Sequence, residues 1–168
     1  LQEQGAEVIM TRTEDETVPI LDRVSKWMEE KPDLILSIHC NAEEASGDQR
    51  GFLTFYTYDL GNDAQTIINE TVAEEMNLPM ELPRKTNLAV SRVSVCPSLV
   101  LETGFFSNAQ DHAWLLQPQT QKDYGVAIGK AAERYLLSTQ TDGEISVFVN
   151  GEKLAFDQPP VIQQDRTL

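Results

Sequence analysis

Two short apolar runs, at 34–38 and 99–101, constrain this chain more than any other feature. Each run stands between helical segments and is followed by a polar side chain, His39 after the first and Glu102 after the second. A short run without polar alternation is typical of a strand that is covered on both faces. Strands that alternate with helices predict an α/β fold, with an open, mostly parallel or mixed sheet and helices on both faces.

Hydrophobic periodicity gives the approximate limits of the other elements. Thr13 and Glu16 have the spacing of a capping box, and Pro19 suits a first helical turn, so a helix should run from there to about residue 30. Asn108 is a suitable cap for a later, short helix. The remaining expected elements are strands at 7–11 and 51–58 and helices at 62–77, 108–116 and 120–137.

The pattern changes from helix to strand after residue 137. We expect a first domain at 1–137, a polar linker at 138–144, and the beginning of a small β domain at 145–168. Residues 145–149 have the period of a strand, with Ile145, Val147 and Val149 at alternate positions, and Asn150 with Gly151 is typical of a two-residue hairpin turn. A lone hairpin is only marginally stable in water, so we expect this second domain to be incomplete.

The net charge of −14 limits the possible partners. Nucleic-acid binding through phosphates needs a surface rich in lysine and arginine, so it is excluded. No apolar run approaches the ~20 residues that a membrane-spanning helix needs. The two cysteines, Cys40 and Cys96, lack metal-motif spacing and lie in or beside apolar segments. This favours two buried free thiols, with one disulfide as the alternative.

His39 and Glu102 are the candidate functional residues, because the carboxyl ends of parallel strands gather at one edge of a sheet. Neutral imidazole is the commonest metal ligand, but a lone histidine is also often a hydrogen-bonded core residue. A carboxyl group after a buried strand has a raised pKa and suits a general base, or it forms an ion pair with Arg92 or Arg12. Cys40 should point to the opposite side of its strand from His39, so the two should not bind one ion.

Four other polar residues are expected to have structural roles. Asp111 and His112 fall at the start of a predicted helix, where an acid meets the positive end of the helix dipole. Asp15 and Arg23 are expected to cap and pair around the first helix.

The segments 33–42 and 97–108 carry a resemblance to a known family. They read D-L-I-L-S-I-H-C-N-A and P-S-L-V-L-E-T-G-F-F-S-N. In this order and with these flanks, they resemble the zinc-dependent N-acetylmuramoyl-L-alanine amidases, over about residues 1 to 137. The resemblance implies hydrolysis of the amide between N-acetylmuramic acid and the L-alanine of the peptidoglycan stem peptide. It also implies a Zn²⁺ ion held by two histidines and a glutamate, and an extracytoplasmic location.

Carried over residue by residue, His39 matches the second zinc histidine of the family, and Glu102 matches its catalytic glutamate. In the implied mechanism, zinc polarises the amide carbonyl and lowers the pKa of its bound water toward ~7, while Glu102 moves a proton from that water to the leaving amine. The resemblance further implies that Asn41, Asn87 and Arg92 face the peptidoglycan substrate.

Departures from the family pattern lead to further expectations. The other two zinc ligands of the family precede the position of Gly5 and have no counterpart among these residues. We therefore expect a chain that lacks the first strand and most of the first helix and is inactive alone.

Two alternatives stay open. One is a catalytically silent peptidoglycan-binding or regulatory module of the same fold, and the other is an acidic α/β domain in which His39 and Glu102 pair with each other or with arginines. The tail at 145–168 resembles the start of the small β domain named for copper amine oxidase amino-terminal regions. This implies wall or surface association and no copper chemistry.

Overall fold

A computed structural model of the chain describes residues 1–42, 47–78 and 82–139, together with the backbone of four two-residue strands in the tail. The chain divides into two compact units, Leu1–Leu136 and Leu137–Leu168. The first unit contains every candidate functional residue.

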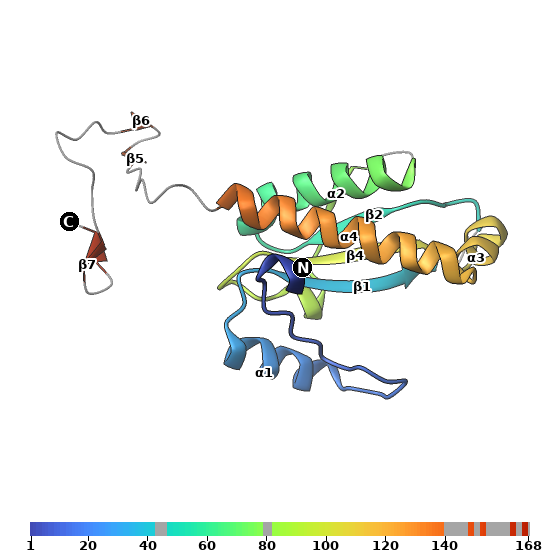
Figure 1. Cartoon of the computed structure of the whole chain (residues 1–168), viewed down its shortest axis with the longest axis horizontal. Coiled ribbons are helices and arrows are strands. Elements are labelled where there is room, and N and C mark those ends of the chain that lie inside the picture. The colour runs from blue at the N-terminus through green and yellow to red at the C-terminus, as the bar shows by residue number, and fades with distance from the viewer. Residues whose placement is uncertain are drawn as a thin grey trace. The chain divides into compact units, whose positions relative to one another are not determined.

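A four-stranded mixed sheet forms the centre of the first unit (Figure 1). Its strands lie in the order β1-β4-β2-β3, with β4 parallel to β1, β4 antiparallel to β2, and β2 parallel to β3. Their bounds are β1 (Ile35–Asn41), β2 (Leu53–Tyr56), β3 (Arg84–Lys85) and β4 (Ser98–Phe105). The α/β fold with a mixed sheet that the sequence predicted is confirmed.

Helices cover both faces of this sheet, with α2 and α4 on one face and α1 on the other (Figure 1). The helices are α1 (Ile20–Glu30), α2 (Asn62–Met76), α3 (Ala109–Leu115) and α4 (Pro118–Thr139), with short 3₁₀ turns η1 (Gln2–Gln4), η2 (Asp59–Gly61) and η3 (Ala89–Ser91). Each helix ends within two residues of its predicted end, because its apolar stripe repeats at the helical period. The predicted linker at 138–144 starts too early, since α4 continues through residue 139.

The main core lies between the sheet and the pair α2 and α4. Leu99 and Leu101 of β4, Ile68 of α2 and Ala131 of α4 are all completely buried there. On the opposite face, Ile35 packs with Val93 and Cys96, and Trp27 of α1 covers them in part. Because side chains alternate along a strand, Val100 and Glu102 belong to the face opposite Leu99 and Leu101.

The strand predicted at 7–11 is wrong. Within the described residues no strand pairs with this segment, and Val8, Ile9 and Met10 are 37%, 36% and 57% exposed. Apolar and β-branched residues favour an extended backbone, but a strand also needs a neighbour for its N–H and C=O groups.

Two further predictions around α1 and β1 need correction. The capping box of Thr13 and Glu16 does not form, because α1 begins at Ile20 and its N-cap is Pro19, without a side-chain hydrogen bond. The prediction that β1 is covered on both faces is also wrong. In the described part of the chain β1 is paired only with β4 and so lies at the edge of the sheet, and its Ile38 is 59% exposed.

In the second unit, β5 (Phe148–Val149) pairs antiparallel with β6 (Glu152–Lys153), and two residues separate them. This matches the hairpin that the Asn150–Gly151 turn predicted. A second short pair joins β7 (Ile162–Gln163) to β8 (Arg166–Thr167). The other residues from 140 onward, including most of the predicted linker, lie outside the described residues.

Candidate active site

His39 and Glu102 lie side by side on neighbouring parallel strands. The register of β1 and β4 places His39 directly opposite Glu102, and the register of β4 and β2 places Leu53 on the other side of Glu102. Adjacent strands are about 4.8 Å apart, so the two side chains project from neighbouring positions on one face. Both residues lie inside their strands, whereas the sequence predicted that each would follow a strand that had ended.

An irregularity in the pairing follows immediately after these two residues. His39 is opposite Glu102 and Asn41 is opposite Phe105, so β4 uses one more residue than β1 over this stretch. The Thr103 hydroxyl donates a 3.0 Å hydrogen bond to the His39 carbonyl, which ties the strands together within the irregularity. Such a bulge redirects the side chains that follow it and is common next to functional sites.

Gly104 stands in this irregularity, where a larger residue would crowd the side chains of α3. A Cβ atom at this position would lie 2.9 Å from Cδ1 of Leu115 and 3.2 Å from Oδ2 of Asp111. The glycine therefore lets α3 pack closely against the end of β4, two residues beyond Glu102.

Glu102 is the more constrained of the two candidate residues. Its side chain is half-buried, and its Oε2 atom is buried without a hydrogen-bond partner in the described structure. Burial disfavours the charged form and raises the pKa of the Glu102 carboxyl above its ordinary value. A carboxyl group with a raised pKa is suited to accept and return a proton near neutral pH.

The pKa of His39 shifts in the opposite direction. Partial burial of the imidazole lowers its pKa, and the positive charge of Arg23 on α1 lowers it further. Arg23 is held in place because its Nε donates a 3.0 Å hydrogen bond to the Val18 carbonyl. A lowered pKa favours neutral imidazole, which is the form that binds a metal ion.

The arginines that the sequence offered as partners of Glu102 have other contacts. Arg12 donates to the Glu16 carbonyl over 2.9 Å, and Arg92 donates through Nε to the Asn87 side chain. Among the described contacts, no ion pair joins Glu102 to either arginine.

The three residues expected to face the substrate do not all lie at the carboxyl ends of β1 and β4, near His39 and Glu102. Asn41 ends β1 two positions beyond His39, and its carbonyl accepts a 2.8 Å hydrogen bond from the Phe106 N–H. Asn87 and Arg92 contact each other on the loop after β3, and no described contact joins them to His39 or Glu102. Their substrate-facing role stays a prediction.

Asp111 has a larger structural role than its place near a helix start indicated. It is 1% exposed, and its Oδ2 accepts hydrogen bonds from the N–H groups of Gly51 at 2.8 Å and Phe105 at 3.0 Å. Arg50 lies 3.6 Å from its other oxygen. Asp111 therefore joins the start of β2 to the end of β4, a long-range contact that no local sequence pattern indicated.

Asn108 strengthens the same connection. As predicted, it caps α3, and its side chain accepts hydrogen bonds from the N–H groups of Gln110 and Asp111. Its Nδ2 also donates a 2.8 Å hydrogen bond to the Gly47 carbonyl. The loop between β1 and β2 is thus held against the segment after β4, beside the edge that carries His39 and Glu102.

The two cysteines differ in exposure. Cys96 is buried, as expected, but Cys40 is exposed because β1 lies at the sheet edge, and both thiols are free. The Cys40 Sγ atom lies 3.4 Å from the Thr103 hydroxyl oxygen, and strand alternation puts both on the face opposite His39 and Glu102. This agrees with the expectation that Cys40 and His39 do not share an ion.

The metal-binding side chains at the carboxyl ends of β1 and β4 do not complete a zinc site on their own. Catalytic zinc takes three protein ligands and a water molecule. Over residues 1–42, 47–78 and 82–139, no group of three histidine, cysteine, aspartate or glutamate side chains is placed to hold a metal ion. Of the three protein ligands that zinc requires, the described residues therefore supply His39 alone, since Glu102 matches the catalytic glutamate of the family and not a zinc ligand.

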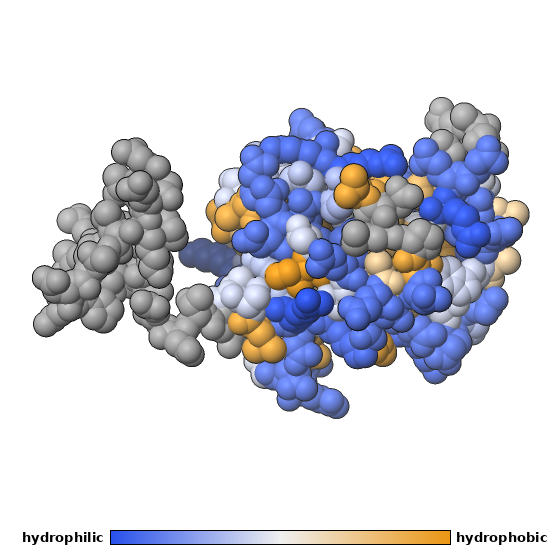
Figure 2. All heavy atoms as spheres, turned by 90° about the horizontal axis from the view of Figure 1, so that it is seen from above, coloured by the Kyte–Doolittle hydropathy of each residue, from blue (hydrophilic) through white to orange (hydrophobic). Residues whose placement is uncertain are grey.

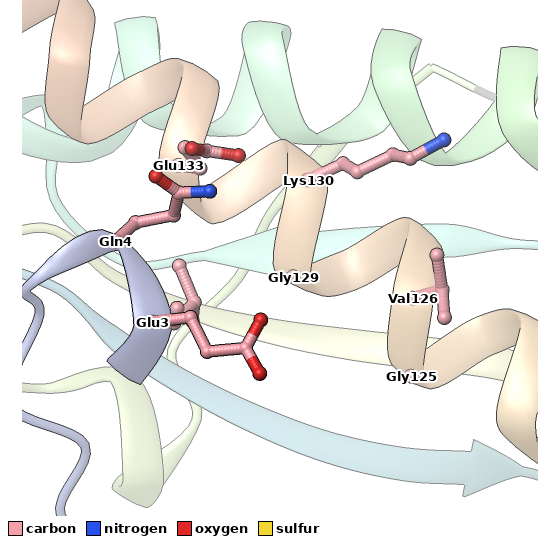
Figure 3. Close-up of a pocket in the computed structure, with 8 residues that line it drawn as sticks. Glu3, Gln4, Gly125, Val126, Gly129, Lys130 and Glu133 are labelled. Carbon is pink, nitrogen blue, oxygen red and sulfur yellow. The ribbon is translucent and has the colours of Figure 1, made fainter.

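A hollow of about 340 Å³ lies elsewhere, between η1 and α4 (Figure 3). Glu3 and Gln4 reach from η1 toward α4, where Gly125 and Gly129 present no side chain. Neither His39 nor Glu102 lines this hollow. Figure 2 shows mostly hydrophilic side chains, with separate hydrophobic patches, on the face that it presents.

The chain is an α/β protein with a histidine and a glutamate at neighbouring strand positions, an arrangement compatible with hydrolysis. The model of one hydrolase family, described as N-acetylmuramoyl-L-alanine amidase, matches residues 1–134, and the chain belongs to this family.

Among curated proteins, the chain is 31% identical over 121 residues to the N-acetylmuramoyl-L-alanine amidase LytC of Bacillus subtilis, covering 70% of this chain and 24% of LytC. It is 30% identical over 115 residues to the probable cell wall amidase LytH of Staphylococcus aureus, covering 68% of this chain and 38% of LytH. The chain thus spans well under half the length of these two relatives.

Solved structures agree with the family. The catalytic domain of the amidase CwlV from Bacillus (Paenibacillus) polymyxa superposes with a TM-score of 0.73 at 27% identity, over 77% of this chain and 72% of CwlV. The amidase AmiC2 of Nostoc punctiforme superposes with a TM-score of 0.77 at 26% identity, over 81% of this chain and 76% of AmiC2.

Proposed function

We propose that this chain forms part of a peptidoglycan hydrolase that cleaves the amide between N-acetylmuramic acid and the L-alanine of the stem peptide. The family match over residues 1–134 supports the reaction class. The observation that carries the proposal is the position of Glu102, half-buried and directly opposite His39 on the neighbouring strand.

Glu102 is the proton carrier in this proposal. Its carboxylate takes a proton from the attacking water as the new C–O bond forms, and it then gives that proton to the leaving nitrogen as the C–N bond breaks. Its raised pKa favours this exchange because burial makes the protonated form easier to reach than in an ordinary glutamate. His39 is the metal ligand, because its lowered pKa keeps the imidazole neutral.

Zn²⁺ is the proposed cofactor, and when bound it would polarise the amide carbonyl and lower the pKa of the attacking water. Since His39 is a single ligand and Glu102 is the proton carrier, we propose that zinc binding needs further ligands in addition to His39. The 168-residue chain alone is then inactive.

The expected location is extracytoplasmic, which fits the name of LytH, a probable cell wall amidase. No helix of the described chain is both long enough and apolar enough to cross a membrane. The assignment of the tail to a wall-associated β domain stays a prediction, because most of the tail lies outside the described residues.

A second candidate is a module that binds peptidoglycan without cutting it. The incomplete donor set favours this alternative. The two candidates differ in what happens when a longer version of the protein supplies the remaining zinc ligands. A hydrolase then cleaves peptidoglycan, whereas a silent module stays inactive.

The test combines binding, zinc content and cleavage. Purified chain, Glu102→Gln and His39→Ala are incubated with peptidoglycan sacculi, and newly released amino termini of L-alanine are labelled and counted, with and without added zinc. The same assay is run on the longest native form of the protein. Release by that form, abolished in Glu102→Gln and His39→Ala, supports the hydrolase. Binding to sacculi without release in every form supports the silent module, and neither binding nor release refutes both.

A further inference from the structure

Arg84 of β3 lies on the same face of the sheet as Glu102. Glu102 pairs with Leu53 of β2. Two positions further along β2, Phe55 pairs with Val100 of β4 on one side and with Arg84 on the other. Directly paired residues share a face of a sheet, and every second residue along a strand returns to that face. Arg84 is therefore a cation on the face that carries the proton carrier of the proposed hydrolysis.

The pairing register also gives the approximate separation of Arg84 and Glu102. Two strand spacings of about 4.8 Å lie between β4 and β3, and two residues of about 3.4 Å each separate the two positions along the strands. The two Cα atoms are therefore about 12 Å apart. An extended peptide spans at most about 3.3–3.6 Å per residue, so this separation corresponds to about three residues of a peptide that runs across the sheet from Glu102.

The chain segment after β3 borders the surface between these two residues. The Thr57 hydroxyl donates a 2.9 Å hydrogen bond to the Thr86 carbonyl and lies 2.7 Å from the Ser91 hydroxyl oxygen. Thr57 follows Phe55 by two positions, so the segment passes over the same face of the sheet. Arg84 is exposed and Phe55 is only partly buried, which leaves both side chains accessible to a ligand beside this segment.

Arg84 has no acidic partner among the described residues. The described ion pairs use Arg50, Lys85 and Lys130, but not Arg84. The neighbouring Lys85 belongs to the opposite face of the sheet and lies 2.5 Å from an Asp59 oxygen. An unpaired cation is notable in a chain with 27 acidic and 13 basic residues. The planar guanidinium group, with five N–H donors, matches the geometry of a carboxylate that a ligand supplies.

We propose that Arg84 binds a free carboxylate of the stem peptide, about three residues from the amide that is cleaved. This inference rests on the proposed function, because that function places the scissile amide at Glu102. Arg84 thereby selects peptides with a free carboxylate over peptides in which this group is an amide. Charge on an edge strand also discourages association with other strands, but that effect does not depend on which face carries the charge.

The experiment compares two N-acetylmuramoyl tripeptides that begin with L-alanine. They differ only at the C-terminus, which is a free carboxylate in one and an amide in the other. Calorimetry measures the binding of each to the 168-residue chain, where no cleavage is needed. The carboxylate form should bind about fivefold more tightly, the upper end of what an exposed ion pair contributes, and added salt should reduce this preference. The net charge of −14 by itself favours the amide, so equal binding, or tighter binding of the amide, would overturn the proposal.

Two neighbouring substitutions separate the role of Arg84 from a general effect of charge. The preference for the carboxylate should disappear in Arg84→Gln and persist in part in Arg84→Lys. Lys85→Gln is the matched control, because Lys85 is the adjacent exposed cation on the opposite face, and it should keep the full preference. Equal losses in Arg84→Gln and Lys85→Gln would refute a specific role of Arg84.

The longest native form of the protein provides a second measurement. The ratio of kcat/KM for the two tripeptides should favour the carboxylate form in the original protein and in Lys85→Gln, but not in Arg84→Gln. Equal cleavage of both tripeptides by the original protein would overturn this inference and leave the proposed function intact. If neither tripeptide is bound or cleaved, the proposed function fails together with the inference.

Discussion

Replacement of Asp111 tests which hydrogen bonds stabilise the carboxyl end of β4, next to Glu102. In Asp111→Ala the buried N–H groups of Gly51 and Phe105 both lose their acceptor, because both donate to the same oxygen, Oδ2. Each unsatisfied buried donor costs about 1–3 kcal/mol, so the loss of the acceptor for two donors should lower the free energy of unfolding by roughly 2–6 kcal/mol. The pairing with Arg50 adds little, since Arg50 is 56% exposed and solvent screens the charge.

Asp111→Asn separates the acceptor from the charge. The amide oxygen can still accept from both N–H groups, so only the added strength of a charged acceptor is lost, about 1–2 kcal/mol. Urea unfolding followed by tryptophan fluorescence measures both variants, with Trp114 three residues along the same helix. Asp123→Ala is the control, because Asp123 is exposed and, among the described hydrogen bonds, accepts one from Gln119 within α4. A loss below about 1 kcal/mol in Asp111→Ala, or a larger loss in the asparagine variant, would contradict this account.

Three further predictions concern the same region. Since burial raises the folded-state pKa of Glu102 above its ordinary value of 4.5, its stabilising contribution is complete below pH 4.5 and is lost as pH rises through the folded pKa. The free energy of unfolding of Glu102→Gln should therefore rise relative to that of the original chain as pH increases above 4.5. Urea unfolding of both proteins at a series of pH values measures the difference. Elemental analysis of the 168-residue chain should find well below one zinc per chain. Near-stoichiometric zinc that disappears in His39→Ala would instead show that the 168-residue chain completes the zinc site without further ligands. Gly104→Ala should cost about 1–3 kcal/mol because its Cβ would press on Leu115. Gly125→Ala, which meets no atom within 4 Å on α4, should add about 0.5–1 kcal/mol, and thermal unfolding that shows the same sign for both would count against this packing argument.

The helices were the most predictable part of the fold. Helical periodicity and caps act over neighbouring residues, so the limits of α2 and α4 and the Asn108 cap of α3 were all accessible from the order of residues. The candidate site was accessible in a similar way, because a histidine and a glutamate each follow an apolar run. The structure adds that the two residues occupy directly paired positions on neighbouring strands.

The strands were less predictable, because a strand depends on a partner that is distant along the chain. The residues at 7–11 have the composition of a strand but pair with no strand in the described part of the molecule. The burial of β1 also depends on distant partners. Because β1 pairs only with β4 in the described part of the chain, it is less covered than expected, and Cys40 is exposed. The pairing register, the irregularity after Glu102 and the hydrogen bonds of Asp111 likewise join residues far apart in sequence.

The sequence of neighbouring residues therefore accounts for the class of fold, the helices and the chemical types of the candidate residues. These features follow from preferences that act over a few neighbouring positions. The three-dimensional packing accounts for which side chains meet and how each is solvated. The raised pKa of Glu102 and the lowered pKa of His39 belong to this second group. Both shifts come mainly from burial, and burial is a property of segments that meet from distant parts of the chain.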